Sequence, residues 1–138
     1  MFDSSALKTT AFTENAKLSV FVKMDIEGSE YDTLPQFVPY LDNVNGMVIE
    51  FHNIDKYEKQ FLKILDDFEN KFYIAHVHGC NFAGLIENTN IPKTLEITFL
   101  NKKLVEEKKE LSRKKYPIKG LDFPDNVYRK DYVLHFDE

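Results

Sequence analysis

Three short segments of the sequence combine carboxylates with imidazoles, the side chains that move protons and bind cations. They are Asp25-Ile-Glu27-Gly-Ser-Glu30, Glu50-Phe-His52 and His76-Val-His78-Gly-Cys-Asn81. A carboxylate or a neutral imidazole can take the proton of a hydroxyl group. The same groups can hold a divalent metal ion, although the sequence contains no tight metal motif such as H-E-x-x-H. Each segment follows or ends an apolar run, so the elements that carry these runs decide whether the three segments meet.

The apolar runs predict an α/β fold. Residues 18–25, 47–52, 72–78 and 94–100 are rich in β-branched and aromatic residues and predict four strands, the first buried on both faces. About 20 residues separate the first two strands, which suits a helical crossover between parallel neighbours. Apolar residues at helical spacing predict a helix over residues 57–68. Strands alternating with helices indicate the α/β class.

Ligands bind beyond the carboxyl ends of the strands in an open parallel sheet. If the first three strands are parallel neighbours, the three segments therefore converge on one rim of the sheet. Glu50 lies inside an apolar strand, and a buried carboxylate needs a partner or a function.

Simpler structural roles compete with this interpretation. Residues 29–32 fit the spacing of a capping box, so Glu30 and Asp32 could serve only to begin a helix. Gly28 is then a hinge between strand and helix, and His76 an ordinary, partly buried histidine. Pro35 predicts a break, followed by a second helical stretch to about residue 41 and a turn over 42–46.

The other segments carry weaker signals. We interpret residues 1–17 as a connector or a remnant of upstream strands, and 18–138 as the domain. Residues 101–115 are crowded with Lys and Glu and predict an exposed helix or a mobile arm. The tail, 116–136, alternates turn signals with one strand-like run at 132–136.

Composition excludes several classes of protein. The 138 residues suit one domain, and 18 Lys plus Arg against 23 Asp plus Glu give a net charge of -5, which argues against a nucleic-acid surface. Cys80 is the single cysteine, so no intramolecular disulfide can form. No apolar run approaches the roughly 20 residues that span a bilayer. We therefore expect a soluble cytoplasmic domain with no membrane or nucleic-acid partner.

Four segments together resemble the FkbM-type methyltransferases, which depend on S-adenosylmethionine (SAM). Lys23-Met-Asp-Ile-Glu-Gly-Ser-Glu30 resembles the family's K-x-D-x-E-G-x-E, and Glu50-Phe-His52 its later E-x-H. His78-Gly-Cys-Asn81 is similar to the family's H-x-N-N, with Cys80 in place of one asparagine. Residues 92–98 and 121–124 resemble the closing segments. The resemblance covers about residues 18–136.

The resemblance implies a class I methyltransferase with a seven-stranded Rossmann-like sheet that methylates hydroxyls of sugars or natural products. Asp25 would end the fourth strand beside the methyl donor, which implies a catalytic and a cofactor-binding role. His52 or Asp25 is the expected base. The implied site residues are Asp25, Glu27 and His52 as catalytic residues, with Glu50, His78 and Asn81 as substrate-binding residues.

The chain also departs from the family's pattern. None of the five glycines forms the G-x-G turn that lets a backbone approach the donor. We therefore expect a partial Rossmann-like sheet that lacks the N-terminal cofactor-binding strands, in a fragment or a split form. SAM binding is expected for the complete domain and is expected to be weak or absent in this chain. The first strand would have an open edge, which predicts self-association or coverage by residues 5–13.

Two further functions compete with the methyltransferase. One is a non-catalytic α/β interaction module that kept the fold without the cofactor half. The other is a small metal-dependent hydrolase that uses Asp25, Glu27, His52 and His78. The leading interpretation includes no metal ion.

Overall fold

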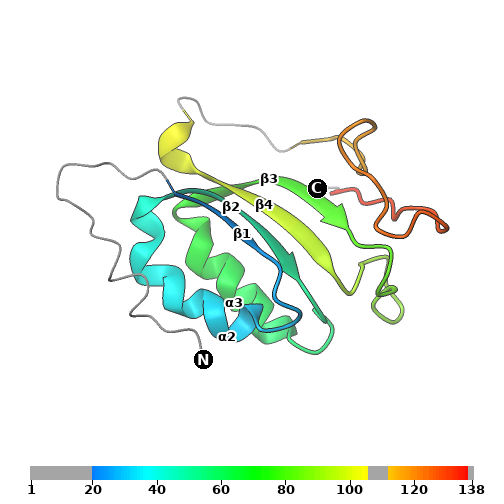
Figure 1. Cartoon of the computed structure of the whole chain (residues 1–138), viewed down its shortest axis with the longest axis horizontal. Coiled ribbons are helices and arrows are strands. Elements are labelled where there is room, and N and C mark those ends of the chain that lie inside the picture. Colours follow the sequence, from blue (N-terminus) through cyan, green and yellow to red (C-terminus); the bar gives the residue numbers. More distant parts are fainter. Residues whose placement is uncertain (1–19, 106–111, 137–138) are drawn as a thin grey trace.

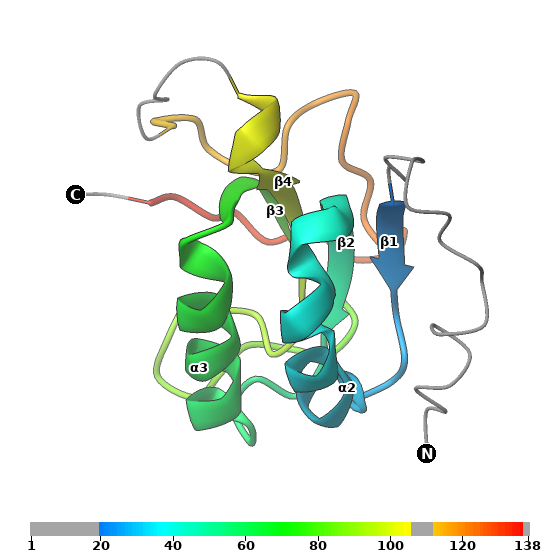
Figure 2. The same cartoon turned by 90° about the vertical axis from the view of Figure 1, so that its left-hand side faces the viewer.

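A computed structural model describes residues 20–105 and 112–136, and in them the chain is an α/β protein with one four-stranded mixed sheet. Two helices lie on one face of the sheet (Figures 1 and 2). The elements in chain order are β1 Val20–Met24, α2 Glu30–Phe37, the 3-10 helix η1 Val38–Asn43, β2 Val44–Phe51, α3 Glu58–Glu69, β3 Phe72–Gly79, β4 Leu95–Asn101 and the 3-10 helix η2 Lys102–Leu104. The strands and the long helix that the sequence predicted are confirmed.

The strand order is β1-β2-β4-β3, with β1 and β2 parallel and β4 antiparallel to both β2 and β3. β1, β2 and β3 thus run in one direction, and their carboxyl ends lie at the same end of the sheet. The condition that the first three strands are direct neighbours is met for β1 and β2 but not for β2 and β3, which β4 separates. Leu95, Ile97 and Phe99 of β4 are buried, so this strand fills the centre of the sheet between them.

The core lies between the sheet and the helices. Phe99 of β4 is at its centre, with its ring centroid 6.4 Å from that of Phe51 and 5.4 Å from that of Phe68. Phe51 and Phe68 come from β2 and α3, and all three rings are almost fully buried. The aromatic residues thereby hold the end of β2 in place against α3.

β1 forms one edge of the described sheet. Phe21 on it is 62% exposed, so the prediction of burial on both faces is wrong. The ring lies over Gly46, where an added Cβ would come within 2.7 Å of it. The turn predicted over residues 42–46 is wrong for 44–46, because β2 begins at Val44. The proposed connector, 1–17, and the proposed cover, 5–13, lie outside the described residues, and self-association through this edge stays a prediction.

α2 continues through Pro35, so the predicted break is wrong. Leu34 is fully buried and the Tyr31 hydroxyl donates a hydrogen bond to the backbone oxygen of His52 at 2.7 Å. These two contacts hold the helix against the core and outweigh the backbone hydrogen bond that proline removes. None of the helices in the described ranges is both long and apolar enough to cross a membrane.

The tail, residues 116–136, contacts β3 through Asp122, 2.7 Å from His76, and Asp131, 2.9 Å from His78. Tyr116 and Leu134 pair through backbone hydrogen bonds of 2.9 Å in each direction. Of the strand predicted at 132–136, only this bridge at Leu134 is present. In the segment predicted as an exposed helix or mobile arm, 101–115, residues 102–104 form the short 3-10 helix η2. Residues 106–111 of this segment lie outside the described part.

We predict that Asn101→Ala destabilises the fold by about 1–3 kcal/mol, the cost of a buried carbonyl left without its donor. Asn101 is 3% exposed and its amide donates to the backbone oxygen of Val44 at 2.7 Å, which joins the end of β4 to the start of β2. Urea unfolding measures the change. The control is Asn90→Ala, at an exposed position, whose free energy of unfolding should stay within about 0.5 kcal/mol of the wild-type value. Equal midpoints for the two variants would contradict the assigned role.

Candidate functional site

The carboxyl ends of β1 and β2 bring together a cluster that we call the His52 cluster: Asp25, Glu27, Glu30, Glu50 and His52. Nε2 of His52 lies 3.7 Å from Oδ1 of Asp25, 3.6 Å from Oε2 of Glu27 and 3.4 Å from Oε1 of Glu50. The predicted convergence on one rim is therefore present for the first two segments. The catalytic and substrate-binding roles of these residues stay predictions.

The turn between β1 and α2 places the first two carboxylates. Glu27 and Gly28 have φ values of 55° and 99°, and the second of these is a conformation that favours glycine. Gly28 is thus a hinge, as the sequence suggested. The two positive φ angles reverse the chain between the end of β1 and the first turn of α2.

Glu30 has a larger role than the capping box implies. Ser29 makes no side-chain capping bond, so that prediction is wrong. Glu30 is instead fully buried, and its Oε1 accepts from the backbone N–H groups of Ile26 at 3.3 Å and Gly28 at 3.2 Å. The same oxygen lies 2.9 Å from Nδ1 of His52. Only Asp32, which is exposed, remains a plain helix-start residue.

Two pKa values in the cluster are raised. Burial lowers the pKa of His52, but the hydrogen bond and charge of Glu30, followed by the charges of Glu50 and Glu27, raise it above its usual value. Burial raises the pKa of Glu50, and the charge of Asp25 adds to the effect. Each shift follows from carboxylates held close together with little solvent between them.

His78 belongs to a neighbouring site rather than to the His52 cluster. Its Nε2 lies 2.9 Å from Oδ2 of Asp131 in the tail. His78 and Glu50 both line a pocket of about 230 Å³. The other residues that line this pocket are Cys80, Glu96, Leu121, Asp122, Phe123 and Asp125. Glu50 therefore connects the cluster at β1 and β2 with the third predicted segment.

Asn81 holds the tail, and its predicted contact with a substrate stays a prediction. The side chain is 1% exposed. Its amide nitrogen donates to the backbone oxygens of Asn126 at 3.0 Å and Arg129 at 3.2 Å, and its oxygen accepts from the N–H of Asn126 at 2.7 Å. Asn81 therefore positions residues 126–130.

Two other polar residues of this segment have structural environments. Nε2 of His76 lies 2.7 Å from Oδ1 of Asp122, and its ring packs edge-on against Tyr116, as expected of an ordinary partly buried histidine. Cys80 is buried, and burial raises the pKa of its thiol to about 11. A thiol with this pKa is protonated near neutral pH and is a poor nucleophile.

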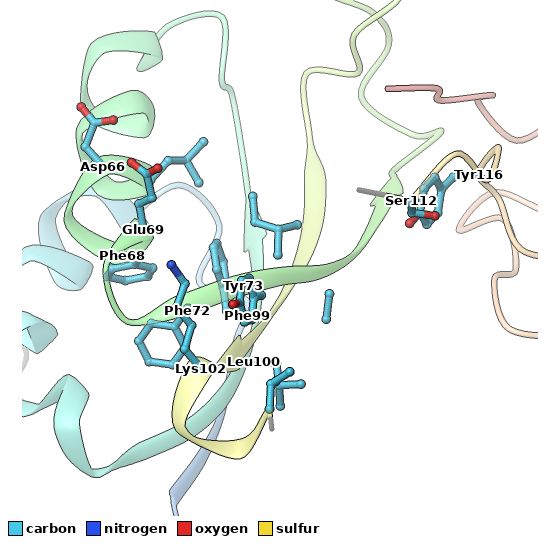
Figure 3. Close-up of a pocket in the computed structure, with 14 residues that line it drawn as sticks. Asp66, Phe68, Glu69, Phe72, Tyr73, Phe99, Leu100, Lys102, Ser112 and Tyr116 are labelled. Atoms are coloured by element: carbon cyan, nitrogen blue, oxygen red, sulfur yellow. The ribbon is translucent and has the colours of Figure 1, made fainter. Parts of the chain in front are cut away.

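A larger pocket lies at the opposite end of the sheet. It has a volume of about 690 Å³ and is lined mainly by α3, the start of β3 and the end of β4 (Figure 3). Phe68, Phe72 and Tyr73 contribute to its largely apolar wall. Since ligands of open α/β sheets bind at the carboxyl ends of the parallel strands, we place the candidate site at the His52 cluster instead.

No protein-family model matches the chain, and no curated protein or solved structure matches it either. Inference about function therefore depends on the strand order and on the chemistry of the rim. For SAM, the described residues contain no Gly-rich turn that would form a cradle.

We predict that stability falls as pH rises through the raised pKa of His78, and that His78→Gln flattens this fall. Burial lowers the pKa of His78, but the hydrogen bond and charge of Asp131 raise it further, so the net shift is upward. The stabilisation from the His78–Asp131 pair is fully present below about pH 6.5, the pKa of histidine in the unfolded chain. It is lost as the pH rises through the higher pKa of His78 in the folded chain. Urea unfolding across this range measures it.

His135→Gln, at an exposed position, is the matched control for this series and should keep the wild-type slope. Because His52 is shifted in the same direction, His78→Gln should reduce the slope without abolishing it. A wild-type slope in His78→Gln would show that the Asp131 pair does not carry the effect.

Proposed function

We propose that the described fold is the acceptor-binding half of a SAM-dependent O-methyltransferase domain, with a hydroxyl of a sugar or natural product as acceptor. The strand order is the observation that carries the proposal. A classic doubly wound sheet has the order 3-2-1-4-5-6. β1, β2 and β3 fit its strands 4, 5 and 6, and the antiparallel β4 adds a seventh strand between the last two. A seven-stranded sheet is what the resemblance implies for the complete domain.

The position of the His52 cluster supports the same proposal. In this alignment, the carboxyl end of β1 borders the crevice where ligands of open α/β sheets bind. Asp25 follows that end directly, and its side chain is 44% exposed. A carboxylate there can contact both a cationic donor and an acceptor hydroxyl, which is the dual role that the resemblance implies.

The chain's own residues would position the hydroxyl and take its proton. SAM, held by the complete domain, would supply an electrophilic methyl group. The residues of this chain would hold the hydroxyl in place, and positioning accounts for much of the rate of such reactions. Glu30 orients the imidazole of His52, and Nε2 then faces the more exposed carboxylates. We propose His52 or Asp25 as the proton acceptor.

The proposed hydrolase has less support. Asp25, Glu27 and His52 come together, but His78 is paired with Asp131 and lies at the neighbouring pocket. Three of the four residues proposed for it thus share a site. The proposed interaction module depends on the edge of β1, which has no strand partner among the described residues.

We predict that SAM titrated calorimetrically into this chain gives weak or no binding, because the described residues contain no Gly-rich turn. The longest reading frame that contains the chain should bind SAM. In that longer protein, Asp25→Asn should weaken SAM about 10- to 100-fold, the value of a lost charge-assisted contact. Asn90→Ala is the control and should bind as the wild type does.

No binding by the longer protein would contradict the methyltransferase proposal itself. Tight binding by the short chain would contradict only its assignment as the acceptor half. Equal SAM affinity in Asp25→Asn and wild type would remove Asp25 from the cofactor side.

A further inference from the structure

We propose that Asp25, Glu27 and His52 bind one divalent ion of the first transition row, with Glu30 as a positioning residue. One ligand atom from each of these three residues lies within 4.8 Å of the other two. The site uses the same cluster as the proposed function but does not depend on methyl transfer.

The distances around His52 match shared ligation better than hydrogen bonding. Nε2 lies 3.7 Å from Oδ1 of Asp25 and 3.6 Å from Oε2 of Glu27, whereas an N–H···O hydrogen bond measures about 2.7–3.2 Å. Two N or O ligands of one metal ion lie about 3.0 Å apart at a right angle and about 3.4 Å apart at the tetrahedral angle. Small side-chain rotations would therefore bring these atoms around a single ion.

Glu30 fixes the orientation of the imidazole from the Nδ1 side, away from the proposed ion. It is fully buried. Its Oε1 lies 2.9 Å from Nδ1 of His52, so a neutral imidazole carries its proton on Nδ1 and directs a lone pair from Nε2. Metal-binding histidines typically have this arrangement, with a carboxylate that fixes the ring and raises its basicity.

The charge of the cluster favours a cation as well. Within residues 20–105 and 112–136, no lysine or arginine forms an ion pair with Asp25, Glu27, Glu30 or Glu50. Lys23, a nearby cation, pairs with Glu96. The lone pair of Nε2 therefore points at an excess of negative charge, which a divalent ion would neutralise.

Exposure indicates an open coordination sphere. The side chain of His52 is 13% exposed, against 44% for Asp25 and 86% for Glu27. The ion would thus contact the protein on one side and water on the other, as catalytic metal sites with three protein ligands do. A nitrogen ligand combined with carboxylates favours Mn²⁺, Fe²⁺ or Zn²⁺ over Mg²⁺ or Ca²⁺. Because Nε2 of His52 and the Asp25 carboxylate would then be bound to the ion, an acceptor hydroxyl that replaced a water would be acidified by the ion instead of by either side chain.

Calorimetric titration of MnCl₂ into the metal-free chain, without SAM and above about pH 7, tests the site. We expect one ion per chain, with a loss of at least tenfold in affinity for Asp25→Asn and for His52→Gln. Glu30→Gln should weaken binding about 10- to 100-fold, as loss of a carboxylate behind a ligand does. His76→Gln removes another carboxylate-paired imidazole and should leave the affinity unchanged. No heat of binding, or equal losses in all four variants, would overturn the proposal.

A second measurement uses the wild-type chain, so that no variant needs to fold. Substoichiometric Mn²⁺ added to the ¹⁵N-labelled protein should broaden the amide signals of residues 25–30 and 50–53 first. Broadening that begins elsewhere, or at all acidic segments equally, would show nonspecific binding and overturn the site. Since neither measurement involves SAM, failure of the metal site and failure of the methyltransferase proposal are distinguishable.

Discussion

The contact between Glu30 and His52 is the interaction on which the rim depends. It joins the first residue of α2 to the residue that follows β2, through a fully buried carboxylate 2.9 Å from an imidazole nitrogen. The adjacent Tyr31 donates to the backbone of His52, so two successive residues of α2 hold the same position. Removal of one partner from a buried pair costs about 3–5 kcal/mol. The same carboxylate also binds the N–H groups of Ile26 and Gly28, which fixes the turn that carries Asp25 and Glu27.

A second set of contacts builds the other half of the rim from distant sequence. β4 separates β3 from β2, so His78 reaches Glu50 only across the neighbouring pocket. The tail supplies Asp131 to His78, and Asn81 holds the tail's backbone in place. The third predicted segment thus has a structural task, which is to anchor the tail over β3, besides any contact with a ligand.

The sequence predicted most of the elements, because strands and α3 depend on local apolar patterns. It did not predict the place of β4, since pairing direction and strand order leave no mark on the composition of one strand. Pro35 and Glu30 show the limit in another way. Local rules predict a helix break at Pro35, but the burial of Leu34 keeps the helix intact there. They predict a capping role for Glu30, but its carboxylate contacts His52 instead. The pattern of a capping box is the same whether the carboxylate faces solvent or a histidine 22 residues away.

An acidic cluster of this kind is an unfavourable way to stabilise a fold. Four carboxylates surround one imidazole, and Glu30 leaves one buried oxygen without a hydrogen bond among the described residues. Apolar residues of similar size would stabilise a rim as well or better. Departures from local rules of this size are typical of functional sites. The cluster has the charge to attract a cation, and the same charge disfavours ligands that carry phosphate or carboxylate groups. The rim is therefore better suited to a cationic or neutral ligand than to an anionic one.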